Sequence, residues 1–268
     1  ETSGFSKIFP GITPYGLTLG TFFWLPFLRD YIMAVGTCSV SRSSIDFLLT
    51  KRGAGNMLIV VVGGLAECRY SLPGSTTLVL KNRTGFVRMA LRHGQPGVAH
   101  GALTHSLDLH PVGLGAEEPI GRTGGTTGGQ CVWLSAGALP FRPSKNILFL
   151  CSMCLIPAYT FGETELYNQH IFTPGGFINS FQNWSQRPVH IYPCAFYRRG
   201  FTENSWGLLP YARPVTTIVG KPLPLPQTEN PSQETVAKYH TLYINALHKL
   251  FDQHKTKYGF SETQKLVI

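Results

Sequence analysis

The stretch from Ile59 to Glu67 constrains the fold of this chain more than any other part of the sequence. Four β-branched residues, Ile59 to Val62, are followed by Gly63-Gly64 and then by a carboxylate, Glu67. A continuous apolar run of this kind is typical of a strand that is buried on both faces of a sheet. In open α/β sheets, ligands bind outside the carboxyl ends of the strands. The run therefore predicts a buried strand that places Glu67 at a functional edge.

Two further patterns indicate an α/β fold. Residues 155–161 form a second apolar run, which leads into Gly162-Glu163. The segment 84–93 puts apolar and basic residues on opposite faces of a helix, and apolar residues recur at helical spacing over 236–251. We predict one domain over residues 1–268, with a central, mostly parallel sheet that includes 58–62 and 155–161 and has helices outside it. Asn230-Pro231 is the predicted start of the last helix.

Residues 95–154 interrupt this pattern. They are rich in glycine and include RTGGTTGGQ at 122–130, where no helical or strand period is visible. The segment is not a P-loop, because no Gly-Lys-Ser/Thr follows the glycines. A structureless stretch of this length is unusual inside a compact domain. We interpret it as an irregular insertion, for example an intron read in frame, and expect it to lie outside the central sheet.

The charge of the chain predicts anionic partners. The formal net charge is +9, which attracts phosphates and anionic membrane surfaces. Nucleic acid is not an expected partner, because the sequence has no zinc-finger spacing, no RNA-binding aromatic motif and no long Lys/Arg block.

Cysteine spacing and apolar runs bear on two further features, a metal site and a membrane-spanning helix. Cys151 and Cys154 have the spacing of a metal-ligand pair, but no second pair with matching spacing completes a zinc site, so we expect no metal. No apolar run reaches the ~18 residues that a membrane-spanning helix needs. The aromatic run around 22–27 is either core or a segment that dips into a membrane interface.

Three spaced motifs carry a family resemblance. They are Gly-Gly-x-x-Glu within Val62–Glu67, Arg-x-Gly-Phe-x-Arg-x-Ala-x-x-x-Gly over Arg83–Gly94, and an apolar pair, Pro and Phe-Gly-Glu within Leu155–Glu163. In this order they resemble the signature of the diacylglycerol acyltransferase 2 family, in which the last two motifs are almost adjacent. The resemblance covers residues 1–94 and 155–268. The stretches 3–11 and 251–257 indicate the wax alcohol branch of the family.

The resemblance implies an activity and a location. It implies a glycerophospholipid-acyltransferase-like fold and an enzyme that transfers a fatty acyl group from acyl-CoA to a long-chain alcohol, retinol, or a mono- or diacylglycerol. Acyl-CoA would be a co-substrate, and no bound cofactor is expected. The implied partners are acyl-CoA, the lipid alcohol and a membrane, at the cytosolic face of the endoplasmic reticulum.

The family's catalytic base is not found in this sequence. The resemblance implies a His-Pro-His-Gly motif upstream of the residues that match Glu1 onward, and the 268 residues contain no such motif. We therefore expect the chain by itself to transfer no acyl groups. The alternative function is a catalytically inactive form that associates with lipid or membrane.

Two carboxylates are the candidate polar centre. Glu67 either orients the missing base or the acceptor hydroxyl, or is a strand-end carboxylate paired with Arg69 or Arg83. Glu163 follows the second predicted strand, so we expect it near Glu67 at the same edge of the sheet.

Four basic residues are candidates for the phosphates of coenzyme A. Lys81, Arg83 and Arg88 either face the phosphates or lie on a solvated helix face, and Arg offers bidentate contacts to phosphate. Arg42 is the nearest match to a phosphate-facing Arg of distant phospholipid acyltransferases, or it is an ordinary surface residue. We expect Glu67 and Arg83 to line one cleft.

Overall fold

The computed structural model describes most of the chain outside the glycine-rich segment and the region between 171 and 210. The described residues are 9, 11–51, 55–68, 70, 72–94, 112–114, 146–151, 154–166, 168–170, 176, 180, 195–199, 206–207, 211 and 213–268.

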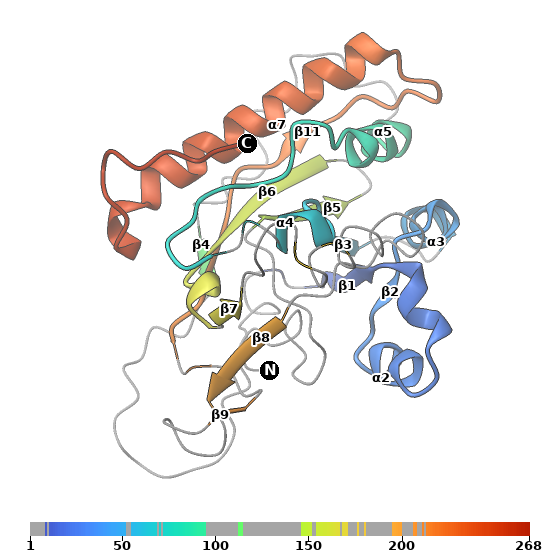
Figure 1. Cartoon of the computed structure of the whole chain (residues 1–268). Coiled ribbons are helices and arrows are strands. Elements are labelled where there is room, and N and C mark those ends of the chain that lie inside the picture. The colour runs from blue at the N-terminus through green and yellow to red at the C-terminus, as the bar shows by residue number, and fades with distance from the viewer. Residues whose placement is uncertain are drawn as a thin grey trace.

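A large mixed sheet forms the centre of the structure (Figure 1). Its strand order is β2-β1-β3-β5-β6-β10-β4, and β11 also pairs with β6. The strands are β1 (Thr13–Thr18), β2 (Cys38–Ser39), β3 (Asn56–Val61), β4 (Val112–Leu114), β5 (Asn146–Cys151), β6 (Cys154–Phe161), β10 (Thr216–Val219) and β11 (Leu223–Pro224). A second, small sheet contains β7 (Asn168–His170), β8 (Ala195–Arg199) and β9 (Trp206–Gly207).

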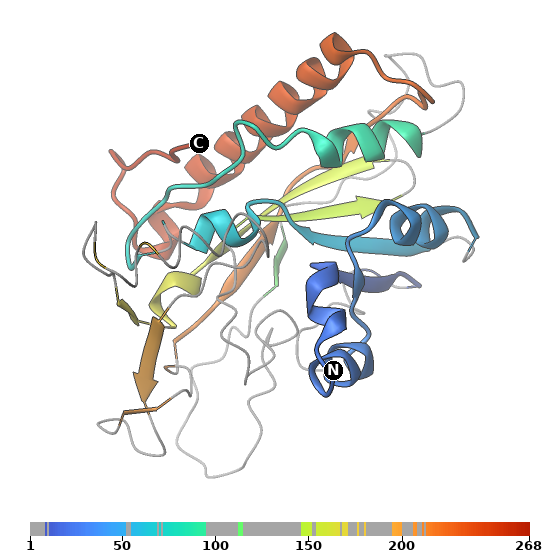
Figure 2. The same cartoon turned by 45° about the vertical axis from the view of Figure 1, so that its right-hand side comes forward.

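Helices lie on the outside of the large sheet. They are η1 (Gly20–Trp24), α2 (Leu28–Ala34), α3 (Arg42–Asp46), η2 (Phe47–Lys51), α4 (Gly64–Cys68), α5 (Gly85–Arg92), η3 (Glu163–Glu165), α7 (Gln233–His254) and η4 (Thr256–Tyr258). The long helix α7 and the shorter α5 run side by side over one face of the sheet in both views (Figures 1 and 2). Within the described part of the chain, no helix combines the length and the apolarity needed to cross a membrane.

The central strands are buried on both faces, as the sequence predicts. In β3, Leu58 and Val60 belong to the main core beneath α5 and α7, whereas Met57 belongs to a second core on the opposite face. Strand β6 alternates in the same way, with Tyr159 in the main core and Ala158 in the second. This period of two is expected, because successive side chains of a strand point to opposite faces.

The α/β class is confirmed, but the expectation of a mostly parallel sheet is wrong. Among the strand pairs that the structure describes in the large sheet, β1 with β2 and β1 with β3 are parallel. The other pairs of the large sheet are antiparallel. The reason is β5, which pairs with β3 on one side and with β6 on the other. Since β5 is antiparallel to both, β3 and β6 run in the same direction.

The expected exclusion of residues 95–154 from the sheet is also wrong. The end of this segment forms β5 in the middle of the sheet, with Leu150 opposite Leu58 in β3 and Leu155 in β6. Its residues 112–114 form β4, which pairs with β10. Residues 95–111 and 115–145 lie outside the described residues. Strand β5 enters the sheet because Cys151 pairs with Cys154 across a tight connection, which only antiparallel strands allow.

The predicted helices occur with small shifts at their starts. Helix α5 matches the predicted segment 84–93, and α7 matches the helix predicted from 236–251. The start of α7 differs from the prediction, because the N-cap is Ser232 rather than Asn230. The Ser232 hydroxyl accepts a hydrogen bond from the Thr235 N–H at 3.2 Å, which satisfies an otherwise unpaired donor of the first turn.

A matched pair of leucines in α7 tests this packing. Leu247 is fully buried against the sheet, whereas Leu242 is 43% exposed on the same helix. Leu247→Ala should lower the free energy of unfolding by about 2–5 kcal/mol, because a buried Leu loses contacts and leaves a cavity. Leu242→Ala should change it by about 0.5 kcal/mol or less. Denaturant unfolding measures both, and equal losses would contradict this orientation of α7.

Candidate functional site

The first carboxylate, Glu67, lies in the short helix that follows the end of β3. Glu67 lies in α4 and has no solvent exposure. Its Oε2 atom accepts a long hydrogen bond of 3.4 Å from the backbone N–H of Val79. A Cβ atom added at Gly63 would overlap the Glu67 carboxylate. Glycine is therefore required at position 63, because the carboxylate occupies the space that any side chain would take.

The second carboxylate follows the end of β6. Gly162 adopts a φ of 81°, and a Cβ atom there would collide with the carbonyl of Pro214. This left-handed turn favours glycine. It directs the chain into η3, where Glu163 is 4% exposed. Because β3 and β6 run in the same direction, Glu67 and Glu163 both follow carboxyl ends at one edge of the sheet.

Two buried tyrosines are affected by the charge of these carboxylates. Tyr159 of β6 is 1% exposed, and Tyr243 of α7 is fully buried. Burial raises the pKa of the Tyr159 hydroxyl, and the charges of Glu67 and Glu163 raise it further. Burial and the Glu67 charge likewise raise the pKa of the Tyr243 hydroxyl. Both carboxylates thus act electrostatically on the same phenol, and the expectation that Glu163 lies near Glu67 stays a prediction.

The two phenols and the two carboxylates, here called the carboxylate cluster, differ in their hydrogen-bonding roles. Both phenols stay neutral at ordinary pH, since their pKa values lie well above the ordinary value. A neutral phenol is a hydrogen-bond donor, and a carboxylate is an acceptor. Glu67 accepts the Val79 N–H inside the apolar core, so its carboxylate has a fixed orientation, which is what a positioning or acid–base group requires.

A basic turn lies between the Glu67 contact and α5. Arg83 follows Val79 by four positions, and its backbone N–H donates to the Leu80 carbonyl at 2.8 Å. The side chains of Lys81 and Arg83 are exposed. Thr84, the residue before α5, makes no capping side-chain hydrogen bond in the described structure, and a Cβ at Gly85 would meet nothing within 4 Å. The start of α5 is thus open, and such a start favours anions.

The other two basic candidates have different surroundings. Arg88 Nη2 donates to Gln233 Oε1 at 2.8 Å, which ties α5 to the start of α7. Arg42 is exposed at the first position of α3, whose cap is Ser41. No described contact joins Arg42 to the basic turn at Lys81 and Arg83.

Glu67 and Arg83 form no ion pair in the described part of the chain. Glu67 is buried and Arg83 is exposed, and the backbone from Val79 to Arg83 is the shown connection between them. Their location in one cleft stays a prediction. Arg69, the other possible partner of Glu67, lies outside the described residues. No group of metal-ligand residues was found among the residues that the structure describes.

Sequence reasoning missed the tyrosines and one ion pair. Tyr243 was assigned only to the apolar face of its helix, although a buried phenol usually needs a polar partner, and that requirement was the available signal. His93 Nε2 lies 2.7 Å from Asp46 Oδ1 and so connects the end of α5 with α3. The two residues are distant in the sequence, and no local signal predicts their contact.

Two motif glycines provide a test of the seat of Glu67. Gly63→Ala should destabilise the fold by about 1–3 kcal/mol, because the added methyl displaces a buried carboxylate. Gly85→Ala in α5 should be neutral or stabilising by up to about 1 kcal/mol, since its Cβ has space and alanine favours a helix. Thermal or denaturant unfolding compares them. An unchanged stability in Gly63→Ala would mean that Glu67 is not seated against that glycine.

Comparison with known protein families finds one family model that matches most of the chain. The family model described as diacylglycerol acyltransferase matches residues 1–102 and 148–268. Residues 103–147 fall outside this match, within the segment interpreted from the sequence as an insertion.

Individual relatives agree with the family model. The whole chain aligns with human acyl-CoA wax alcohol acyltransferase 2 at 63% identity and with the mouse protein of that name at 60%. It aligns with human diacylglycerol O-acyltransferase 2 at 39% identity. The chain spans 63% of the length of the first two relatives and 54% of the third.

The family and its wax alcohol branch were therefore correctly indicated by the sequence motifs. No solved structure matches this chain. The carboxylate of the Gly-Gly-x-x-Glu motif, the Phe-Gly-Glu turn and the match over both flanks together show that the chain belongs to the diacylglycerol acyltransferase family.

Proposed function

We propose that this chain forms the substrate-binding part of an acyl-CoA:alcohol O-acyltransferase. In the reaction, the hydroxyl oxygen of the acceptor attacks the thioester carbonyl of acyl-CoA. A C–O ester bond forms, the C–S bond breaks, the hydroxyl proton goes to a base, and coenzyme A leaves as a thiolate that is then protonated. The products are an ester and free coenzyme A.

The observation that carries this proposal is a buried carboxylate, Glu67, whose hydrogen-bond donor Val79 lies a few residues before an open, basic helix start. Glu67 is fully buried, and the Val79 N–H donates to it. Four residues later, Arg83 is exposed at the start of α5. An acyl-CoA molecule needs a polar reaction centre and, some distance away, cationic groups for its phosphates. The segment from Val79 to Arg83 joins a group of each kind.

The basic turn would bind the phosphates of acyl-CoA. Lys81 and Arg83 supply positive charge, and the first N–H groups of α5 supply donors. Arg88 would support this site indirectly, because its guanidinium is held by Gln233. Arg42 would contribute only if the bound coenzyme A extends to α3.

Glu67 would act as a positioning group for the reaction. Its buried carboxylate accepts hydrogen bonds and would orient either the acceptor hydroxyl or the base that removes the hydroxyl proton. Glu163, at the same edge of the sheet, would be the second carboxylate of this polar reaction centre. The neutral phenols of Tyr159 and Tyr243 would keep the carboxylates fixed.

The names of the relatives suggest the acceptor. Two of them are called acyl-CoA wax alcohol acyltransferase 2. A long-chain alcohol is therefore the first acceptor to test, so that the product would be a wax ester. Retinol and mono- or diacylglycerol are the alternative acceptors, and a relative named diacylglycerol O-acyltransferase 2 supports the last of these.

Long-chain alcohols are supplied in membranes, and one exposed surface suits such a location. We call it the apolar tip: Trp24, Leu25, Phe27, Tyr31 and Met33 of η1 and α2. Trp24 is 82% exposed and Phe27 is 87% exposed. Aromatic and aliphatic side chains of this kind insert at a membrane interface. The proposed location is the cytosolic face of the endoplasmic reticulum.

The apolar tip also supports a second candidate function. The chain could bind lipid surfaces without transferring acyl groups, as a catalytically inactive form. Membrane binding is common to both candidates, so only catalysis by the carboxylate site distinguishes them.

The carboxylate site is tested in a chimera. The matched region of the human wax alcohol acyltransferase 2 is replaced by residues 1–268, with residues 103–147 either kept or removed. Wax ester formation is measured from labelled palmitoyl-CoA and hexadecanol. Glu67→Gln should lower kcat, because the orienting charge is lost. Arg83→Ala should raise KM for palmitoyl-CoA about tenfold or more, because a charge-assisted phosphate contact contributes about 1.5–3 kcal/mol.

Two exposed residues serve as controls in the same chimera. Glu165→Gln changes a neighbouring exposed carboxylate, and Arg213→Ala removes an exposed guanidinium elsewhere. Neither should alter kcat or KM by more than about twofold, since surface changes have small effects. An active chimera in which Glu67→Gln and Arg83→Ala behave like these controls would contradict the proposed roles. A folded but inactive chimera would favour the second candidate.

Membrane binding by the apolar tip is tested separately. Trp24→Ser combined with Phe27→Ser should lower partitioning into phosphatidylcholine–phosphatidylserine vesicles about tenfold or more, because two large apolar side chains no longer leave water. The control is Phe47→Ser, which changes an aromatic residue that is 51% exposed outside the tip. Sedimentation with vesicles measures the effect. Equal vesicle binding by the unsubstituted chain, the double variant and the Phe47→Ser control would exclude the apolar tip as the membrane contact.

A further inference from the structure

The C-terminal residues 255–268, here called the C-terminal strap, contact both the segment 74–78 and the end of β6. After α7 ends, the chain turns at Gly259 with a φ of 82° and returns along the segment that precedes α5. Leu266 is 5% exposed and packs into the main core with Leu78 and Leu80. The strap therefore belongs to the folded core.

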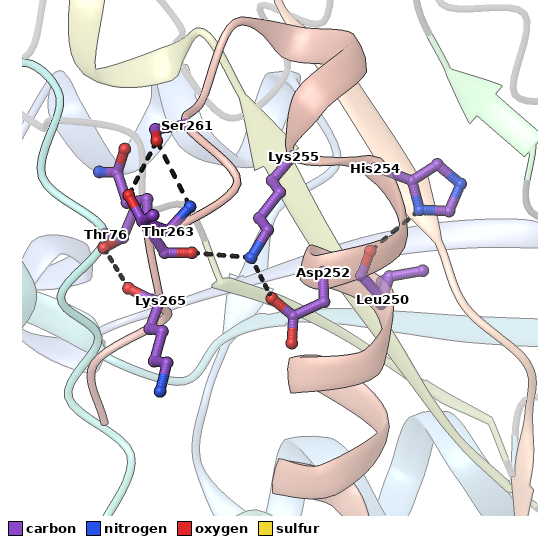
Figure 3. A network of polar contacts seen from close by, with 9 residues as sticks. Thr76, Leu250, Asp252, His254, Lys255, Ser261, Thr263 and Lys265 are labelled. Atoms are coloured by element: carbon purple, nitrogen blue, oxygen red, sulfur yellow. Dashed lines mark hydrogen bonds and ion pairs between the residues drawn. The ribbon is translucent and has the colours of Figure 1, made fainter.

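The strap pairs with the backbone next to the Glu67 contact. The Leu78 N–H donates to the Val267 carbonyl at 2.7 Å, and the Val267 N–H donates to the Thr76 carbonyl at 3.3 Å. The Thr76 hydroxyl donates to the Lys265 carbonyl at 2.8 Å (Figure 3). The next residue after Leu78 is Val79, whose N–H donates to Glu67 Oε2. The strap thus fixes the segment 76–79, in which the Val79 N–H is the hydrogen-bond donor to the buried Glu67 carboxylate.

The strap also contacts the loop of the second carboxylate. The Tyr258 ring stacks on the Phe161 ring with 4.6 Å between centroids. The Phe260 ring meets the Phe161 and Phe251 rings edge-on, each at 5.8 Å. Phe161 is the last residue of β6 and is followed by Gly162 and Glu163. One segment therefore contacts the supports of both carboxylates, although these are about 96 residues apart in sequence.

A lysine adds a polar attachment of the strap to α7, in addition to the contact between the Phe260 and Phe251 rings. Lys255 Nζ donates to Asp252 Oδ1 at 2.8 Å and to the Gln264 carbonyl at 2.9 Å (Figure 3). Its side chain is only 11% exposed. Gln264 in turn donates from Nε2 to the Gly74 carbonyl at 2.9 Å. The Lys255 ammonium group thus holds the strap against α7 directly and against the segment 74–79 through Gln264. Hydrogen bonds from a charged donor are stronger than those between neutral groups.

We propose that the C-terminal strap is a positioning element for Glu67 and Glu163, and that Lys255 is the positioning residue that keeps it in place. The link to catalysis rests on the proposed function. The link between the strap and the carboxylate loops rests on the contacts alone. Lys255 does not touch a substrate in this proposal, and it acts through Gln264, Val267 and Val79.

Hydrogen exchange of the whole chain tests the strap without an activity assay. Lys255→Met should speed exchange of the Leu78, Val79 and Val267 amides about tenfold or more, since a charge-assisted hydrogen bond that holds the strap is lost. Amides in the middle of α7 should change little. Lys255→Arg should restore most of the protection, because arginine keeps a cation with several donors. The control Lys249→Met, an exposed lysine on the same helix, should have no effect.

A second variant makes the test independent of α7. Val267→Pro removes the N–H that donates to Thr76, at a residue that is 54% exposed near the chain end. It should speed exchange at Leu78 and Val79 without affecting α7. Unchanged exchange at these amides in both variants would overturn the proposal. An equal increase throughout α7 would also overturn it, because Lys255 would then stabilise the fold as a whole.

Catalysis provides the last readout in the chimera described above. Lys255→Met should lower kcat several-fold and leave KM for palmitoyl-CoA within about twofold, because no contact shown among the described residues joins the strap to the side chain of Lys81 or Arg83. Lys255→Arg should recover kcat. A change confined to KM would contradict a positioning role. An inactive parent chimera would count against the proposed function only, since the exchange measurement still decides whether the strap holds the loops.

Discussion

The burial of the Glu67 carboxylate is the constraint on which the rest of the site depends. A buried carboxylate is tolerated only where hydrogen bonds and the local geometry compensate for lost hydration. Here the absence of a side chain at Gly63 makes room for it, and the Val79 N–H donates to it. Burial and the charge of this carboxylate raise the pKa of the Tyr159 and Tyr243 phenols, which therefore stay neutral. These groups come from three distant parts of the chain, so that correct placement of the carboxylate requires the whole fold.

The family motifs acquire separate physical roles in this arrangement. Glycine at 63 is needed for space, whereas glycine at 162 is needed for a left-handed turn and a close approach to Pro214. Gly94 has a third role, because a Cβ there would lie 2.6 Å from the backbone of Pro226. Phe86 packs against Tyr243 with 5.0 Å between ring centroids, which joins the basic helix to the carboxylate cluster. The motifs are therefore parts of one packed unit around the edge of the sheet.

The sequence predicted the local elements well because their signals are local. The β-branched run of β3 and the helical period of α7 can each be recognised within a short window of sequence. The place of β5 was not predictable in this way, because strand order depends on which sheet edges remain free in three dimensions. The phenols near Glu67 and the pairing of Val267 with Leu78 were missed for the same reason. Their partners are far away in sequence, and a single sequence shows no covariation.

The position of β5 has a consequence for how this fold tolerates changes of length. Leu150 of β5 faces Leu58 in β3 and Leu155 in β6, so that Leu58 and Leu155 are already at the same level of the sheet. The two outer strands run in the same direction, and the chain between them passes through α4 and α5 on one face. Without the intervening strand, β3 and β6 would meet as the two parallel strands of a simple β-α-β crossover. Strand β5 thus lies between two strands that are already aligned, so that a chain without it would have a sheet one strand narrower and no other strand would need to change direction.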